Sequence, residues 1–227
     1  MTRKEIIAKF RQENSEITSR VLTDDVLSSW LLTGNLDYAT RLRCLVDQDG
    51  QTLTTTENQK YIDLTTEIVN FYDIDERPSG GGVVYNNKRL TFATIAELDR
   101  ENIVWRSRNA GTPKKYYRRG QFIYFDRPID SNAEDIKIYC ILLPDDFDAD
   151  NKEPLNEIIY YRPFHNGFVK YLEWQAMGKI GKPQDEAKAL GMYNRYVDWA
   201  KKEIGMGKYS SIQFINPERG NYGTRPA

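Results

Sequence analysis

The feature that most constrains the fold of this chain is a change of hydrophobic period after residue 143. Between Asp135 and Leu143, apolar side chains alternate with polar ones, which predicts a strand with one buried face. Beyond residue 163 the apolar spacing becomes three and four residues, which predicts two helices separated by a break from Gly178 to Pro183. The positions that mark these helices are Phe164, Phe168, Leu172 and Ala176, then Leu190, Tyr193, Val197, Ala200 and Ile204. Because the break is short, we expect the two helices to pack as an antiparallel hairpin.

Two further helices are predicted near the N-terminus. Ile6, Ile7 and Phe10 share one face of the first helix. Thr23 caps the second helix, in which Val26, Leu27, Trp30 and Leu31 are the apolar positions. Both helices are amphipathic, so each needs a partner surface, and we expect them to form a bundle with the C-terminal pair.

The region between these helices predicts a sheet. Its candidate strands lie within residues 41–63, 67–73, 83–85, 105–117, 121–125 and 135–143. Turns are expected at Asp47–Gly50, Asn86–Asn87, Asn109–Pro113 and Arg119–Gly120. Thr94 and Glu97 form a capping-box pattern, which predicts a short helix running to about Arg100.

Together these elements predict an α+β fold. A helical bundle from the N- and C-terminal helices carries an inserted antiparallel β-rich lobe and ends in an extended C-terminal arm. The expected domains are the N-terminal helices over 1–43, the β-rich lobe over 44–153, the C-terminal helical hairpin over 154–206 and the arm over 207–227.

Composition restricts the possible functions. Lys and Arg total 32 against 33 Asp and Glu, so a net charge of -1 gives no general attraction to nucleic acid or to an anionic membrane. Cys44 and Cys140 are far apart and belong to no metal-ligand pattern, so we expect reduced thiols in a cytosolic product. The first residues contain no long apolar run, so neither a signal peptide nor a membrane span is expected.

Catalytic, cofactor and metal motifs are weak throughout. His165 is the single histidine, and no Ser or Cys motif accompanies it as a nucleophile. The glycines at 80–82 precede a strand instead of a helix, and Gly207-Lys208 lacks the remainder of a phosphate loop. Asp47–Gly50 resembles the start of a calcium loop but lacks the later ligands. We therefore expect a protein without catalytic residues, cofactor or metal.

The order of several short motifs resembles a known family. They are Tyr61-Ile62-Asp63-Leu64, Leu90, Glu97-Leu98-Asp99, Trp105, Gly111-Thr112-Pro113 with Tyr116-Tyr117, Phe122-Ile123-Tyr124-Phe125 with Pro128, and the closing helical pair. From about Tyr61 to Ala200 the chain resembles the head-to-tail adaptor, or connector, proteins of tailed bacteriophages. This resemblance implies a noncatalytic subunit of a dodecameric ring that docks on the portal, joins capsid to tail and surrounds the DNA exit channel. The expected partners are further copies, the portal and a downstream tail or neck protein, and the expected location is the virion, with assembly in the host cytoplasm.

The C-terminal tail is a candidate for contact between subunits. Its apolar residues have no helical period and are too few to form a core. Ordering about eighteen residues costs on the order of 18 to 36 kcal/mol, so a neighbouring chain would have to supply the contacts. The contacts of this arm are expected at Ile212, Phe214, Ile215, Tyr222 and Arg225. The alternative is an unattached chain end.

Charge placement gives a second pair of candidate contacts. The basic residues Arg106, Arg108, Lys114, Lys115, Arg118 and Arg119 are expected in one hairpin, with no acid between them. The acidic residues Asp145, Asp146, Asp148 and Asp150 are expected in the loop before the helical pair. In a ring, such patches would face complementary neighbours. The alternatives are phosphate contacts from the basic hairpin to DNA in the channel, or two solvated loops.

Two other functions fit parts of the sequence. One is a different virion component, such as a tail terminator or a baseplate piece. The other is a carbohydrate-directed β module, since Asp and Glu pairs are plentiful, although nothing in their spacing favours action on carbohydrate. The terminal helical pair contains more large rings than one helical seam can bury, which predicts either a larger core or a subunit interface. These rings are Tyr160, Tyr161, Tyr171, Trp174, Tyr193, Tyr196 and Trp199.

Overall fold

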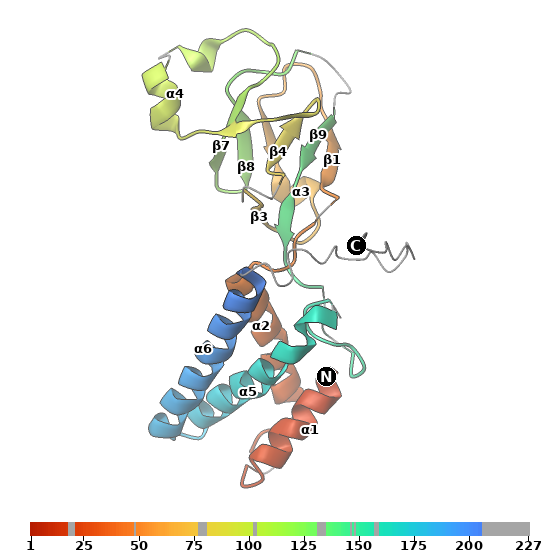
Figure 1. Ribbon diagram of the computed structural model, residues 1–227, viewed down its shortest axis with the longest axis vertical. Coiled ribbons are helices and arrows are strands. Elements are labelled where there is room, and N and C mark those ends of the chain that lie inside the picture. The colour runs from red at the N-terminus through yellow and green to blue at the C-terminus, as the bar shows by residue number, and fades with distance from the viewer. Residues whose placement is uncertain are drawn as a thin grey trace, which may run out of the picture. The chain divides into compact units, whose positions relative to one another are not determined.

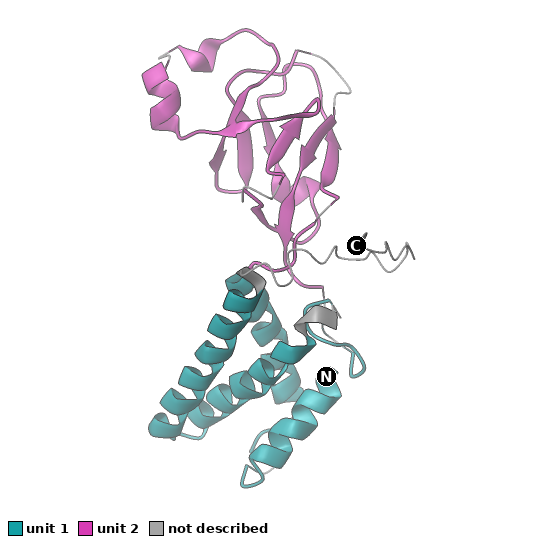
Figure 2. Ribbon diagram, in the orientation of Figure 1, with its two compact units in different colours: residues 1–42, 146–227 teal, residues 43–145 magenta. Residues whose placement is uncertain are grey.

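The computed structural model describes residues 1–17, 21–47, 49–76, 81–101, 104–130, 135–145, 147, 149–156 and 159–205. Two compact units divide the chain, as Figure 2 shows. The first contains Met1–Leu42 and Asp146–Ala227, and the second is the inserted Arg43–Asp145. The first is helical and the second is mainly β-sheet, so the predicted α+β class is confirmed.

The helical unit is organised around one central helix (Figure 1). Its elements are α1 (Arg3–Glu13), α2 (Asp24–Leu42), η2 (Ile159–Phe164), α5 (Asn166–Lys179) and α6 (Pro183–Gly205). Helix α5 contacts α1, α2 and α6, so segments from both ends of the sequence share one core. The largest fully buried side chains there are Phe10, Tyr38, Phe164, Phe168 and Tyr193. None of the helices in the described part of the chain combines the length and hydrophobicity that crossing a membrane requires.

Helix boundaries follow the expected local signals. Thr2 and Glu5 form a reciprocal capping box at the start of α1. The predicted break between α5 and α6 is confirmed, because α5 ends at Lys179 and α6 begins at Pro183. Gly181 lies between them with φ of 74°, a conformation that glycine adopts without steric cost.

The β unit contains two four-stranded sheets and one two-stranded sheet among its described residues. The first sheet has the order β1 (Gln51–Thr54), β9 (Asp135–Ile138), β4 (Val83–Tyr85) and β5 (Lys88–Arg89). The second has the order β2 (Tyr61–Asp63), β8 (Phe122–Phe125), β7 (Lys115–Arg119) and β6 (Thr91–Phe92). Strand β10 (Cys140–Leu142) pairs with β3 (Phe71–Ile74). Except for the parallel β6–β7 pair, the paired strands named here are antiparallel.

Both four-stranded sheets contribute to a shared apolar core. Its fully buried members include Val83, Ile123, Ile136, Ile138 and Cys140. Three short elements complete the unit: α3 (Leu64–Glu67), α4 (Ile95–Glu101) and η1 (Trp105–Ser107). A smaller cluster joins Ala93, Leu98 and Trp105 to the partly buried Tyr117.

Several predicted turns and caps in this unit are confirmed. Asn86 and Asn87 have φ of 47° and 60° and connect β4 to β5. The backbone N–H of Thr94 donates to Glu97, and the N–H of Glu97 donates to the Thr94 hydroxyl, which completes the capping box of α4. Gly120, with φ of 61°, turns the β7–β8 hairpin.

Four strand predictions need correction. Residues 41–42 belong to α2. The predicted strand 67–73 begins too early, because Glu67 ends the helical turn α3, which Asp63 caps by accepting from the backbone N–H of Thr65, and β3 begins only at Phe71. The predicted strand 105–117 is wrong over most of its length, since η1 occupies its start and β7 begins only at Lys115. In 135–143, the alternation ends at Cys140, because the register shifts between Ile141 and Leu142 and buries Ile141.

Candidate functional site

The basic residues predicted to share a hairpin do not all lie in one. Lys115, Arg118 and Arg119 are in β7, whereas Arg106 is in η1 and Arg108 follows it. The intervening segment is tied back onto the sheet, because the N–H of Gly111 donates to the Pro128 carbonyl at 2.8 Å. The basic side chains therefore come from two separate pieces of backbone.

Arg106 is held by contacts within the β unit. Its guanidinium donates to both carboxylate oxygens of Asp99, at 2.5 and 3.2 Å, and lies 4.5 Å from the centre of the Trp105 ring. The Trp105 indole also donates to Asp99, at 2.8 Å. These hydrogen bonds, with that from Arg106 as the larger cause, lower the pKa of Asp99. This cluster fastens η1 to α4.

Asp126 organises the segment between η1 and β7. Only 4% of its side chain is exposed, and it accepts hydrogen bonds from the backbone N–H groups of Lys114 and Lys115 at 2.9 and 3.1 Å. Arg108 also pairs with it, at 3.2 Å. A buried carboxylate with these donors is a structural group that fixes where β7 begins.

The remaining basic residues differ in their pairing. Lys115 pairs with Glu101, and Arg118 pairs with Asp73. Lys114 and Arg119 are exposed and make no side-chain ion pair within the described residues. Of the six basic candidates, these two are thus the ones whose charge remains available to another molecule.

Aromatic side chains form a continuous row across the outer side of the second sheet. Tyr117 and Tyr124 stack with centroids 4.9 Å apart and planes at 12°, and Trp105 meets Tyr117 edge-on at 5.4 Å. Tyr61, which is 52% exposed, lies 5.6 Å from Tyr124, and Phe122 is 5.7 Å from Tyr61. Because Tyr117 and Tyr124 cover each other's faces, the row is better suited to protein contact than to stacking on nucleotide bases.

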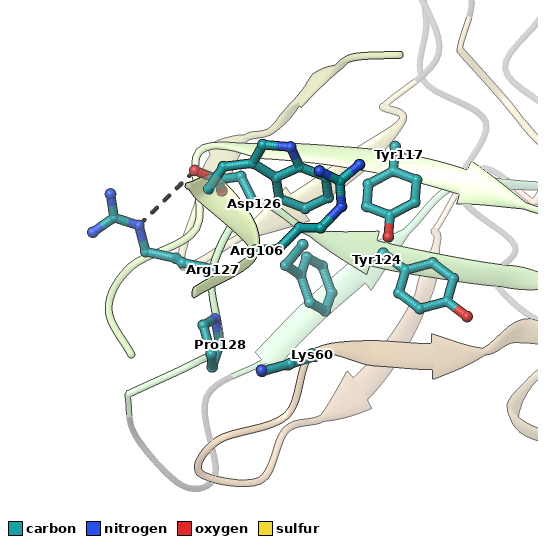
Figure 3. Close-up of a pocket in the computed structure, with 9 residues that line it drawn as sticks. Lys60, Arg106, Tyr117, Tyr124, Asp126, Arg127 and Pro128 are labelled. Atoms are coloured by element: carbon teal, nitrogen blue, oxygen red, sulfur yellow. Dashed lines mark ion pairs between the residues drawn. The ribbon is translucent and has the colours of Figure 1, made fainter. Parts of the chain in front are cut away.

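A shallow pocket lies where η1 meets this row, and Figure 3 shows the side chains around it. Its volume is about 120 Å³, which is small for an organic ligand. Arg106 lines one part, the stacked tyrosines another, and the Arg127–Asp126 ion pair of 3.9 Å marks one end. The lining residues are Lys60, Trp105, Arg106, Tyr117, Tyr124, Phe125, Asp126, Arg127 and Pro128. Sequence reasoning missed Lys60 and Arg127, because the fold brings them to η1 from separate strand ends.

Tyr116 does not belong to the exposed row. Only 2% of it is exposed, and its hydroxyl donates to Glu76 at 3.0 Å. Burial, followed by the nearby Glu76 charge, raises the pKa of Tyr116. Tyr116 is therefore not exposed for contact with another molecule.

The acidic loop is partly engaged within its own chain. Asp150 pairs with Arg3 at 2.7 Å, and its carbonyl accepts from the N–H of Lys4. Asp145 accepts a hydrogen bond from Asn70 at 3.0 Å. Asp146 and Asp148 lie outside the described residues, as do the arm residues Ile212, Phe214, Ile215, Tyr222 and Arg225.

Most rings of the helical pair belong to the core. Tyr193 lies 5.3 Å from Tyr171, 5.9 Å from Tyr38 and 6.2 Å from Trp174, measured between ring centroids. The Tyr193 hydroxyl donates to Asp37 at 2.6 Å, and its burial raises its pKa. Trp199 is the exception, with 42% of its surface exposed. The larger-core interpretation therefore holds for this cluster.

The described residues contain no group of three or more His, Cys, Asp or Glu side chains able to hold a metal ion. His165 is fully buried, with Nδ1 2.7 Å from the Met1 amino group. Cys44 and Cys140 are free thiols, and burial raises the pKa of Cys140 to about 12.

The class of this chain, a phage structural adaptor, follows from its family. The chain belongs to the SU10 adaptor protein family, whose model matches residues 1–208. That match spans both compact units and ends before most of the predicted arm. Comparison with the curated proteins gave no match. A structural adaptor family indicates a non-enzymatic role in the virion.

Proposed function

We propose that the protein is a noncatalytic subunit of a head-to-tail connector ring that docks on the portal and joins the capsid to the tail. The observation that carries this proposal is the family match over residues 1–208, which includes the helical unit and the inserted β unit. The ring has twelve copies, surrounds the DNA exit channel and lies at the head–tail junction of the virion. Its subunits are made in the host cytoplasm.

Each part of the chain has a role in this proposal. The helical unit serves as the bundle that meets the portal, and the β unit presents its aromatic row toward a downstream tail or neck protein. The arm after residue 206 docks on a neighbouring subunit. Contact between the basic residues of the β unit and the acidic loop of a neighbouring subunit determines orientation more than it adds affinity.

The mass of the purified protein, measured by light scattering, tests the ring. The protein is measured alone and after mixing with the portal protein of the same phage. A complex of about twelve subunits in either condition supports the proposal. A monomer in both, together with saturable glycan binding, would replace it with the carbohydrate-binding alternative.

DNA contact is tested at the two basic residues without an internal ion pair. Reversing both Lys114 and Arg119 to Glu should weaken nonspecific DNA binding and reduce its salt dependence, because fewer phosphate charges are neutralised. Filter binding at several salt concentrations measures this. Reversing the exposed Lys179 is the control, and an unchanged salt dependence in the double variant would remove DNA from the proposal.

A further inference from the structure

Helix α2 is apolar on two faces although one of them is exposed. Leu27, Leu31 and Tyr38 are fully buried against the helical core. On the outer side, Val26, Leu32 and Leu36 are 37%, 41% and 43% exposed. The sequence between Asp25 and Asp37 contains no charged residue. A surface helix normally has a charged outer face, so three uncharged turns indicate that this face is covered in an assembly.

The polar groups near this outer face are directed to its own backbone. The Thr33 hydroxyl donates to the Ser29 carbonyl at 3.4 Å, and the Thr40 hydroxyl donates to the Leu36 carbonyl at 2.9 Å. Hydroxyls satisfied in this way can be buried without a partner's hydrogen bond. These two hydroxyls therefore lose little on desolvation.

Helix α6 has an outer face of complementary character. Trp199 is 42% exposed, while its ring packs edge-on against Phe164 at 4.7 Å, which fixes its position. Arg195 and Lys202 are exposed and lie on the same side of the helix as Trp199, within about one turn of it, and the acidic Asp198 and Glu203 also flank the ring. An anchored and partly exposed Trp with charged residues around it is typical of a protein interface.

The charges of the two helices match when the helices run antiparallel. Helix α2 begins with Asp24 and Asp25, and α6 ends near Lys201 and Lys202. The stretch from Asp25 to Leu36 and that from Lys202 back to residue 191 are both about 16 Å long, at 1.5 Å per residue. In this register Asp25 meets Lys202, and Trp199 meets the uncharged first turns of α2 near Ser28.

The geometry points to a second copy of this chain as the occupant of the α2 face, with α2 of one copy packed antiparallel against α6 of the next. Two different faces meet, so the contact is heterologous and can repeat around a ring. The inference rests on the proposed connector function and assigns the surfaces that join neighbouring subunits. A strip about 16 Å long and one helix wide, about 10 Å, is well below the ~800 Å² that each partner buries in a standard interface. One such contact is weak, and ring closure or the portal strengthens it.

A charge exchange tests this contact in the full-length protein. Asp25→Lys and Lys202→Asp each place like charges together, so each should weaken association between copies by about tenfold. The double variant restores opposite charges and should return association to within about twofold of the parent protein. Both positions are exposed, and circular dichroism verifies that each variant remains folded. Lys179→Asp is the matched control, because Lys179 is an exposed base in the last turn of α5.

Association is measured by sedimentation equilibrium, alone and with the portal protein of the same phage. Weakening by each single change, recovery in the double variant and no effect of the control support the contact. If the parent protein forms multimers and the exchange has no effect, the α2–α6 contact is overturned while the connector function stands. If the parent protein forms no multimer in either condition, both are overturned.

Discussion

His165 is fully buried, and its ring makes an edge-on contact with Phe168 at 6.2 Å between ring centres. Its Nε2 has no hydrogen-bond partner within the described residues. The pKa of His165 is lowered to about 4, mainly by burial and next by the charge of the Met1 amino group. The ordinary value is 6.5, so the folded protein keeps this ring neutral where the unfolded chain takes up a proton.

This difference predicts a pH dependence of stability. As the pH falls from 6.5 towards 4, the unfolded state binds a proton that the native state does not, so the free energy of unfolding decreases by up to about 3 kcal/mol. Urea denaturation at pH 7 and pH 4.5 measures the change. His165→Leu lacks the titrating group and should lose less stability over the same interval. Equal losses in the two proteins would show that His165 does not control this dependence.

Asp126 is a second buried group with a measurable role. Asp126→Asn removes the charge that pairs with Arg108 and weakens the acceptor for the N–H groups of Lys114 and Lys115. We expect a loss of about 1 to 3 kcal/mol in the free energy of unfolding. Asp130→Asn, at an exposed neighbouring position, is the control and should change stability by less than about 0.5 kcal/mol. Similar losses in both variants would contradict the structural role of Asp126.

At the scale of elements, close helix packing depends on a glycine in α2. A Cβ added at Gly34 would lie 2.7 Å from Cδ1 of the buried Tyr171, which belongs to α5. At Gly191 in α6, an added Cβ would meet nothing within 4 Å. Replacing glycine by alanine therefore acts through packing at position 34 and through helix propensity at position 191.

We predict opposite effects for alanine at these two glycines. Gly34→Ala should destabilise the protein by about 1 to 3 kcal/mol, because the ring of Tyr171 must move. Gly191→Ala should stabilise it by about 0.5 to 1 kcal/mol through better helix propensity. Thermal unfolding of dilute protein compares them. A stabilising Gly34→Ala would mean that α2 and α5 can separate without loss.

The elements that were easiest to predict have strong local signals. The capping boxes at Thr2 and Thr94, the Asn86-Asn87 turn and the break before Pro183 each depend on residues only a few positions apart. The segment after Trp105 was predicted as a strand because its residues suit a strand. Its actual path depends on Asp99 and Asp126, whose contacts with η1 and the start of β7 are tertiary.

At the scale of the whole molecule, the proposed arm over residues 207–227 lies almost entirely outside residues 1–208, which match the family model. Deleting residues 210–227 should leave the free energy of unfolding within about 0.5 kcal/mol of the parent protein, because that segment has too little apolar content to form a core. It should abolish ring formation or incorporation into virions. Urea denaturation and the composition of purified virions measure the two effects. Normal incorporation of the shortened protein would remove the arm from the proposed function.

The sequence by itself determined the α+β class, the two helices at each end and the turns at Asn86–Asn87 and Arg119–Gly120, because periodicity, capping and turn chemistry act over a few residues. Only the tertiary structure decided which charges remain available. Arg118 is paired with Asp73, 45 positions away, and Arg108 with Asp126, 18 positions away. It also decided that Tyr116 is buried while Tyr61 is exposed. Partners that are distant in sequence meet only when the sheets pack, so no local pattern specifies them.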